Sequence, residues 1–372
     1  MKFLFSITYY TPYISGLTIY AKRLAEALAK RNHQITILTS QHNKKLPSQE
    51  KIKKVKVVRV PTLMKISKGP LMPGWIFTSF RQVLKTNAVL CHLPQFESLV
   101  VAFWAKLLRK KLLVTYHCDV VLPSGFINKI AQIILYFGNF LTCCLADKIV
   151  TYTKDYANHS KFLSQFKDKL VFVLPPILIN NKFKKKAHAA KEMRIGFAAR
   201  IAADKGLEYL FKAIPHLVSK KKGRKLKIFI AGPNPIGEEK YNQKLKNLTR
   251  KYKKYLIFLG GIPPEKMGKF YQIIDILVLP SINKTEAFGI VQVEAMLWGV
   301  PVIATNLPGV RRPIKLTGMG KIIPIKNSQA LAETILEILK NKKRYLRPKR
   351  EIEKIFNFQK TIDFYEKLFK KS

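Results

Sequence analysis

The feature that most constrains the fold is a regular alternation of short apolar strands and helices, which runs through the chain twice. In the first half the pattern predicts strands at residues 3–8, 35–40, 55–61, 88–92, 112–117, 147–153 and 169–176. Apolar residues at helical spacing predict helices at residues 20–30, 98–110 and 130–146. Because strands that alternate with helices form βαβ units, we expect a parallel sheet covered on both faces.

The second half repeats the alternation after Pro175-Pro176 and a polar, basic stretch at residues 180–193, which we predict to be a linker. Strands are predicted at residues 194–200, 225–232, 256–261, 275–281 and 300–305, and helices at residues 206–218, 239–255, 265–274 and 286–299. Apolar residues from Ile355 to Phe369 then predict one terminal amphipathic helix.

This order of segments predicts an α/β fold of two Rossmann-like, doubly wound domains that face a central cleft. We expect the domains at residues 1–178 and 179–348 and the terminal helix at residues 349–372. In open α/β sheets, ligands bind in the crevice at the carboxyl ends of the strands. Residues that follow the strands are therefore the first candidates for a functional site.

The chain is strongly basic, with 68 Lys and Arg against 22 Asp and Glu, a formal net charge of +46. Only 14 of these cations are Arg and 54 are Lys, whereas nucleic-acid grooves rely on Arg for bidentate contacts. The charge fits anionic membrane surfaces and phosphate-bearing ligands, and we expect no specific nucleic acid as a partner. A general lysine bias of the source explains the composition equally well.

The cysteines and the apolar runs bear on the compartment. Four cysteines (Cys91, Cys118, Cys143 and Cys144) form no CxxC pair, which favours a reducing cytosol. The apolar N-terminus has no cleavage site, and the uncharged run at residues 130–146 is shorter than the roughly 20 residues that span a bilayer. We therefore expect neither a signal peptide nor a transmembrane helix.

The segment from Pro280 to Thr305 carries two glutamates, Glu286 and Glu294, in the spacing E-x7-E. The first falls in a strand-to-helix turn and the second about two turns into the helix, so both can face one crevice. Between them Phe288, Gly289 and Ile290 are expected in the first helical turn, whose free N–H groups suit a phosphate, and Gly289 lets a ligand approach the backbone. The alternative is a pair of ordinary surface glutamates.

Four other candidates lie where strands are predicted to end. Arg200 and Lys205 follow the first strand of the second half, where two cations can clamp a diphosphate. His117 ends a strand of the first half, a position that favours a catalytic over a structural histidine. Gly16 lies in the loop after the opening strand, where glycine lets a backbone approach a ligand.

Taken together and in this order, the motifs resemble the retaining glycosyltransferases of family 4, the glycosyl transferases group 1, which have the GT-B fold. The resemblance covers nearly the whole chain, including LLVTYHCD, KLKIFIAG, the helix of the two glutamates and GVPVIAT. It implies a retaining transfer of a sugar from a nucleoside-diphosphate sugar to an acceptor hydroxyl. It also implies an acceptor-binding first domain, a donor-binding second domain and a terminal helix that crosses back to the first.

The resemblance implies a role for each candidate. Glu286 would contact the transferred sugar near its reacting centre, and His117 would lie beside the sugar and the leaving group, so these two are predicted to be catalytic. Glu294 would hold the ribose hydroxyls, and Arg200 and Lys205 the donor diphosphate. The remaining predicted donor-binding residues are Gly16, Phe288, Gly289 and Ile290.

Three departures from the family pattern bear on sugar and acceptor specificity more than on chemistry. The first loop has Ser15-Gly16 in place of a glycine pair, Gly232 is followed by Pro233 instead of a second glycine, and LPGVRRP follows Thr305. The chain also contains no Asp-x-Asp, so we expect no metal and no other cofactor. Cations and the helix N-terminus would then supply the positive potential for the diphosphate.

Aromatic and basic residues interleave in two segments of the first half, which suggests an acceptor at a membrane. The aromatic residues are Trp75, Phe77, Phe80, Phe103 and Trp104, and the basic ones are Lys68, Arg81, Lys85, Lys106, Arg109, Lys110 and Lys111. Exposed together, they would suit an anionic lipid surface. We therefore expect a lipid, glycolipid or polysaccharide-precursor acceptor, cell-envelope glycan synthesis and a peripheral position at the cytoplasmic membrane face. Alternatively, the aromatic residues pack into the helices that cover the sheet.

Two other functions remain open at this point. A nucleotide-sugar epimerase can share the two-domain shape, but it would release a free epimer and need no acceptor. A non-catalytic basic protein that binds membranes or nucleic acid is the second alternative.

Overall fold

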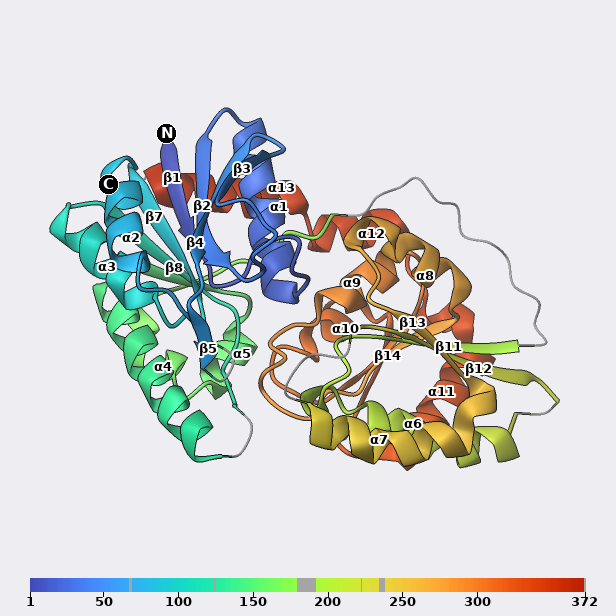
Figure 1. Cartoon of the computed structure of the whole chain (residues 1–372). Helices are drawn as coiled ribbons and strands as arrows, with labels where there is room; N and C mark the ends of the chain where they lie inside the picture. Colours follow the sequence, from blue (N-terminus) through green and yellow to red (C-terminus); the bar gives the residue numbers. More distant parts are fainter. Residues whose placement is uncertain (67–68, 123–124, 179–191, 222, 234–237, 371–372) are drawn as a thin grey trace. The chain divides into compact units, whose positions relative to one another are not determined.

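The computed structural model describes residues 1–66, 69–122, 125–178, 192–221, 223–233 and 238–370 (Figure 1). The chain divides into two compact units, one made of Met1–Pro176 with Phe358–Ser372 and the other of Ile177–Asn357. The linker predicted at residues 180–193 lies, apart from its last two residues, outside the described residues.

The first unit contains an eight-stranded sheet in the order β10-β9-β8-β7-β1-β2-β4-β3. The strands are β1 (Lys2–Ser6), β2 (Gln34–Gln41), β3 (Gln49–Ile52), β4 (Val55–Pro61), β7 (Ala88–Leu93), β8 (Lys111–Tyr116), β9 (Lys148–Thr151) and β10 (Leu170–Phe172). All pairs are parallel except β3 with β4. The chain order of the strands reverses between β1 and β7, which makes this pair the topological switch point of the sheet.

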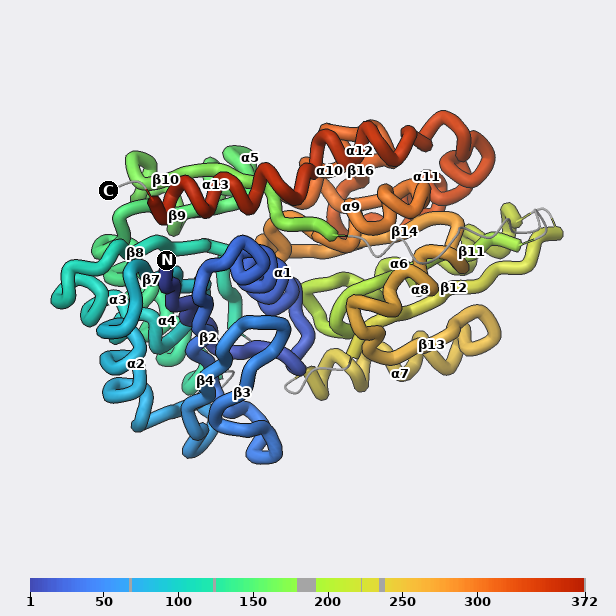
Figure 2. The backbone as a smooth tube through the Cα atoms, turned by 90° about the horizontal axis from the view of Figure 1, so that it is seen from above, coloured from blue at the N-terminus to red at the C-terminus, as the bar shows by residue number. Residues whose placement is uncertain are grey.

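Helices cover both faces of this sheet, as a parallel sheet requires (Figures 1 and 2). Helices α2 (Trp75–Leu84), α3 (Ser98–Leu107) and α4 (Phe126–Leu145) lie side by side on one face, and α1 (Gly16–Lys30) and α13 (Phe358–Lys370) on the other. Smaller elements are the antiparallel pair β5 (Met64–Ile66) and β6 (Gly69–Leu71), and α5 (Lys154–His159).

The aromatic residues of α2 do not all face solvent as predicted. Trp75, at the start of α2, is only 2% exposed, whereas Phe77 is 72% exposed. Helical geometry turns successive residues by about 100°, so neighbours two positions apart face different directions. Trp75 therefore belongs to the core, and Lys68 lies outside the described residues.

The C-terminal helix α13 packs on the first unit through buried aromatic rings. Phe369 stacks on Phe3 with ring centroids 4.1 Å apart. The Tyr365 hydroxyl is hydrogen-bonded to the Tyr20 hydroxyl and to Thr115 Oγ1, each at 2.7 Å. All three hydroxyl-bearing residues are buried, so each bond satisfies a polar group that water cannot reach.

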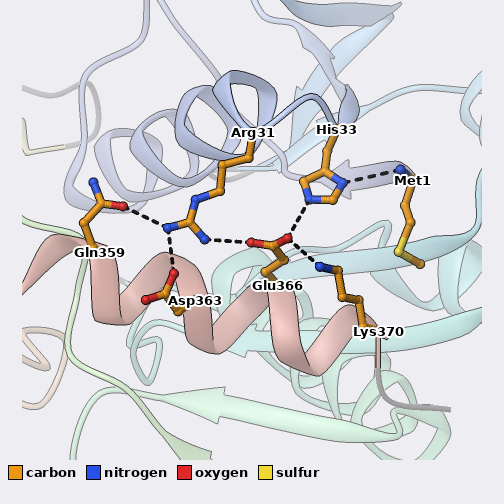
Figure 3. Close-up of polar contacts among 7 residues, drawn as sticks. All are labelled: Met1, Arg31, His33, Gln359, Asp363, Glu366 and Lys370. Atoms are coloured by element: carbon orange, nitrogen blue, oxygen red, sulfur yellow. Dashed lines mark hydrogen bonds and ion pairs between the residues drawn. The ribbon is translucent and has the colours of Figure 1, made fainter.

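A charged cluster holds the outer side of α13 (Figure 3). Arg31 Nη1 donates to Glu366 at 2.7 Å, and Arg31 Nη2 lies 2.6 Å from Asp363. His33 and Lys370 also contact Glu366, at 3.2 and 2.7 Å. The hydrogen bonds from Lys370 and Arg31 lower the pKa of Glu366 to about 2, so this carboxylate stays ionised through mild acid.

The second unit contains a fully parallel six-stranded sheet in the order β13-β12-β11-β14-β15-β16. Its strands are β11 (Glu192–Ala198), β12 (Lys225–Ala231), β13 (Leu256–Gly260), β14 (Ile276–Leu279), β15 (Val302–Thr305) and β16 (Gly320–Ile323). The helices are α6 (Leu207–Ser219), α7 (Glu239–Tyr252), α8 (Met267–Ile273), α9 (Ile290–Leu297), α10 (Arg312–Thr317), α11 (Ser328–Lys340) and α12 (Lys349–Ile355). Helices α6, α7 and α11 lie on one face, and α8, α9 and α12 on the other (Figure 1).

The order of these six strands is that of a Rossmann sheet, with its switch point between β11 and β14. The predicted α/β class with two Rossmann-like units is thus confirmed. The terminal segment, predicted as one helix, forms two: α12 belongs to the second unit and α13 to the first. Helix α12 ends at Phe356, whose buried ring packs edge-on against Phe288 of the second unit. None of the described helices is both long and apolar enough to span a membrane.

Candidate active site

Three of the predicted residues lie at the switch point of the second sheet. Arg200 follows β11 and Glu286 follows β14, the two strands between which the chain order reverses. Lys205 ends a short 3-10 turn that begins at Ala203. The next residue, Gly206, has a φ of +64°, and a side chain there would place its Cβ 2.2 Å from the Pro280 carbonyl oxygen. Glycine thus lets this turn pack against the end of β14.

Lys205 joins these residues into one cluster. Its buried Nζ lies 3.0 Å from Glu286 Oε2 and 2.9 Å from Asp204 Oδ2. Arg200 Nη2 lies 3.6 Å from the same oxygen of Asp204, to which Thr285 donates a hydrogen bond at 2.8 Å. The structure therefore brings Arg200, Lys205 and Glu286 together, with Asp204 at the centre.

The electrostatics of the cluster keep its charges paired. Burial alone would lower the pKa of Lys205, but Glu286 and Asp204 outweigh it, so that this pKa is raised. Burial alone would raise the pKa of Asp204, but Lys205 and Arg200 outweigh it, so that this pKa is lowered. Ionised Lys205 is shared between two carboxylates, and an incoming diphosphate would compete with both for the cations.

Helix α9 begins later than predicted. Ile290 is its first residue, Gly289 is the N-cap with a φ of +76°, and Phe288 precedes the helix instead of lying in its first turn. A Cβ at Gly289 would lie 2.5 Å from Leu279, so the fold itself requires glycine at this position. The Phe288 side chain is buried in the core, so only its backbone is suited to contact a ligand.

Glu294 lies just over one turn into α9, rather than the two turns predicted. Its buried carboxylate accepts a hydrogen bond from the Tyr271 hydroxyl of α8 at 2.8 Å. Sequence reasoning missed Tyr271 because its place in an amphipathic helix looks like an ordinary core position.

In the first unit, Gly16 is the exposed first residue of α1. Ser15 caps this helix by accepting a hydrogen bond from the Thr18 N–H at 3.1 Å. A Cβ added at Gly16 would meet no atom within 4 Å. Packing does not require glycine here, and the predicted contact of Gly16 with a ligand stays a prediction.

His117 directly follows β8, and its side chain is only 4% exposed. Nε2 is hydrogen-bonded to His92 Nδ1 at 2.9 Å, and Nδ1 to the Tyr152 hydroxyl. The Tyr20 ring packs perpendicular to the imidazole, with ring centroids 4.9 Å apart. Burial, with a smaller effect of His92, lowers the pKa of His117 well below its ordinary value. The imidazole is neutral, and a sugar hydroxyl can bond to it only by replacing His92 or Tyr152.

Several contacting residues escaped the sequence analysis for a common reason. His92 lies inside the apolar strand β7, and Tyr152 directly after β9, where both look like core residues. Asp204 was identifiable in principle, because it adjoins Lys205 in the same loop. Among the described residues, no three His, Cys, Asp or Glu side chains are grouped as a metal site requires.

Comparisons with known proteins define the family. The family model of the glycosyltransferase family 4 matches residues 14–177, and that of the glycosyl transferases group 1 matches residues 179–355. An uncharacterized glycosyltransferase of Methanocaldococcus jannaschii is 25% identical over 353 residues, which cover 88% of this chain and 85% of the relative.

Two solved structures resemble the fold over nearly their full length. The sucrose-phosphate synthase of Thermosynechococcus elongatus has a TM-score of 0.77 at 18% identity, with 99% of each chain covered. HepE of Anabaena, in complex with UDP and glucose, has a TM-score of 0.77 at 17% identity, with 100% of each chain covered. At this identity the likeness shows the fold.

Fold and family matches together define a glycosyltransferase enzyme. More closely, the chain belongs to the glycosyl transferases group 1 and has the GT-B fold, as the sequence motifs predicted. This result excludes the non-catalytic alternative and favours transfer over epimerisation.

Proposed function

We propose that this enzyme transfers a sugar from a nucleoside-diphosphate sugar to an acceptor hydroxyl with retention of configuration, and that no metal takes part. The observation that carries the proposal is the Lys205–Glu286 ion pair of 3.0 Å at the switch point of the second sheet. In this proposal Lys205 is the cation that binds the diphosphate, and Glu286 beside it is the carboxylate that contacts the sugar. The UDP and glucose held by the structurally similar HepE support such a donor.

In the proposed reaction the acceptor displaces the diphosphate from the sugar, and the charged side chains act at different stages of this displacement. The bond from the anomeric carbon to the diphosphate oxygen breaks, and positive charge develops on the sugar ring, where a nearby carboxylate such as Glu286 stabilises it. Arg200 and Lys205 neutralise the departing diphosphate. The acceptor oxygen bonds to the same face of the anomeric carbon, and its proton passes to the departing phosphate oxygen.

A binding experiment tests the cationic clamp separately from turnover. Arg200→Ala should weaken UDP binding about tenfold to a hundredfold, since a charge-assisted hydrogen bond contributes roughly 1.5–3 kcal/mol. Lys212 of α6 has an exposed side chain, so Lys212→Ala is the control and should bind UDP like the wild type. Calorimetry with UDP and GDP, both in EDTA, measures the effect. Equal affinity of the two variants for whichever nucleotide binds would exclude Arg200 from the donor site.

For the acceptor, we propose a lipid or lipid-linked glycan at the cytoplasmic face of an anionic membrane, with the enzyme bound peripherally. Helix α4 carries the argument, because its large apolar side chains form an exposed stripe at helical spacing. They are Phe126, Ile127, Ile130, Ile133, Ile134, Phe137 and Leu141, all among the exposed apolar residues. Phe126 is 79% exposed and Phe137 59%. An apolar stripe on this scale is typical of an interfacial helix.

The charged residues of α2, α3 and α4 favour an anionic membrane, rather than a protein partner, as the surface that contacts the apolar stripe of α4. Helices α2, α3 and α4 contain no Asp or Glu, and each carries a cation: Arg81, Lys106 and Lys129. Phe77 on α2 and Phe103 on α3 are exposed as well. Cations among exposed apolar residues favour anionic lipid, at about 1 kcal/mol for each cation near the surface.

Flotation with vesicles tests the membrane proposal. The wild type should float with vesicles that contain anionic lipid, and less so as salt screens the charges. Phe137→Ser should reduce flotation, as should Phe77→Ser, whereas Phe258→Ser on β13 of the second unit is the control for loss of an exposed Phe. A protein that stays at the bottom with anionic vesicles at low salt would have a soluble acceptor instead.

A further inference from the structure

Asp204 connects the two loops of the donor cluster, and the reaction described above gives it no role. Its Oδ2 accepts a hydrogen bond from the Thr285 hydroxyl at 2.8 Å and lies 2.9 Å from Lys205 Nζ. Its backbone carbonyl accepts a hydrogen bond from the Ile282 N–H at 3.0 Å. The loop that follows β11 is thereby bonded to the loop that follows β14, and the Asp204 side chain is only 14% exposed. This carboxylate is therefore held in one place beside the cations.

The side chains in contact in this cluster carry equal numbers of positive and negative charges. The cations are Arg200 and Lys205, and the carboxylates are Asp204 and Glu286. With Glu286 as the only carboxylate, one positive charge would have no counterpart. Asp204 thus supplies, in the free enzyme, negative charge of the kind that a bound diphosphate brings, and this pairing offsets the cost of burying the Lys205 ammonium group.

The two cations are held with unequal strength. Lys205 Nζ is buried and lies within hydrogen-bond distance of both carboxylates. Arg200 Nη2 lies 3.6 Å from Asp204 Oδ2, which is longer than a hydrogen bond, and 33% of the Arg200 side chain is exposed. Arg200 can therefore turn from Asp204 toward a phosphate without breaking a hydrogen bond to this carboxylate, whereas Lys205 is fixed in place.

We propose that Asp204 is a positioning residue that takes the place of the diphosphate in the free enzyme and competes with it for Arg200 and Lys205. It holds the cations where the diphosphate binds, and its negative charge weakens the binding of the nucleoside diphosphate that remains after sugar transfer. This competition favours release of the product, so that the next donor can bind. The inference rests on the proposed function and adds to it the residue that limits the affinity for the nucleotide.

Calorimetry with UDP and GDP in EDTA tests this role in the full chain with the variant Asp204→Asn. Asparagine keeps the size of the side chain and an oxygen that accepts from Thr285, but it removes the charge. We expect the nucleotide that binds the wild type to bind this variant about tenfold more tightly, because a repulsive and competing charge is gone. A residue that only ties the two loops together would give weaker or unchanged binding.

Asp275→Asn is the matched control for this substitution. The Asp275 side chain is 16% exposed and its Oδ1 lies 2.9 Å from Lys342 Nζ, so that it resembles Asp204 in burial and in pairing. It directly precedes β14, however, and therefore lies at the opposite end of this strand from Glu286. The control variant should bind the nucleotide like the wild type.

Two further measurements show whether the charge of Asp204 is the cause. Uridine or guanosine, followed by saturation-transfer NMR, should bind Asp204→Asn and the wild type equally, because a nucleoside has no phosphate that Asp204 could repel. In an Arg200→Ala background the gain from Asp204→Asn should be smaller, since one of the two cations is already absent.

Weaker or unchanged nucleotide binding by Asp204→Asn would overturn the role of Asp204, as would an equal gain for the nucleoside or an equal gain without Arg200. Asp204→Ser also removes the charge and gives the same comparison if the asparagine variant does not fold. Failure of both nucleotides to bind the wild type would refute the proposed donor chemistry and this inference with it. Tighter binding of the nucleotide alone, in Asp204→Asn and not in Asp275→Asn, is the result we expect.

Discussion

The substitution Glu97→Gln, at the N-cap of α3, should make the protein more stable above neutral pH. A carboxyl group with an ordinary pKa of 4.5 when unfolded has a pKa of about 7 in the folded protein, because burial disfavours its charged form. A group whose folded pKa is raised contributes stability that is fully present below pH 4.5 and is lost as pH rises through 7. At pH 8 the wild type therefore carries a buried charge at a cost that the glutamine does not have.

The size of the effect follows from the pKa difference. The pKa differs by about 2.5 between the folded and unfolded states, and each pKa unit corresponds to about 1.4 kcal/mol. The stabilisation at pH 8 is therefore roughly 3.5 kcal/mol as an upper value, and it falls to nothing near pH 4.5. Burial raises the pKa of Tyr9 to about 12, so this phenol stays protonated over the whole range. The lowered pKa of His42 affects the stability of the wild type and of the variant alike. The gain in stability would thus report on Glu97 alone.

Urea unfolding of the full chain at pH 5 and pH 8 measures the effect, with Glu333→Gln as the control for a generic amide substitution. We expect the midpoint of the first unit's transition to rise in Glu97→Gln at pH 8 and to stay close to that of the wild type at pH 5. Residues kept at a cost in stability are typical of functional sites. A variant that is no more stable at pH 8, or whose difference from the wild type is independent of pH, would refute the reasoning.

Three further predictions concern the donor site and α13. Glu286→Gln should lower kcat by about tenfold or more, because it removes charge that acts in the transition state, while Glu294→Ala should mainly raise the KM for the donor. Steady-state kinetics distinguish the two effects, and wild-type kinetics in both variants would refute the assignments. Transfer should survive EDTA, and a complete loss restored by Mn²⁺ or Mg²⁺ would show that a metal holds the diphosphate. Tyr365→Phe should lower the free energy of unfolding by about 1–3 kcal/mol, because the buried hydroxyls of Tyr20 and Thr115 lose their shared partner; an unchanged urea midpoint would contradict this.

The order of the predicted strands and helices could be read from the sequence because apolar residues at a regular period mark these elements. The predicted strand at residues 225–232 is β12 (Lys225–Ala231), and the predicted helix at residues 206–218 is α6 (Leu207–Ser219). The antiparallel edge strand β3 was missed, because its sequence QEKI is mostly polar and lacks a strand pattern. The start of α9 was misplaced because a left-handed Gly289 as N-cap leaves no trace in apolar periodicity.

The candidate site was predictable only where residues follow strands and carry charge. Arg200, Lys205 and Glu286 meet as their positions suggested, because β11 and β14 are neighbours in the sheet. The hydrogen-bond partners of His117 could not be predicted from the sequence. His92 reaches His117 because β7 pairs with β8, and this pairing is set by the tertiary structure. The burial of Trp75 likewise depends on how α2 packs, which alternating aromatic and basic residues do not reveal.

Product analysis tests the central claim most directly. The full-length enzyme is incubated in EDTA with UDP-glucose and other nucleoside-diphosphate sugars and with membrane lipids, and the products are examined by mass spectrometry and NMR. We predict a lipid that is heavier by one sugar residue and in which the sugar keeps the anomeric configuration of the donor. Glu286→Gln should form this product more slowly than the wild type. A free epimerised nucleotide sugar, or a product with inverted configuration, would contradict the account.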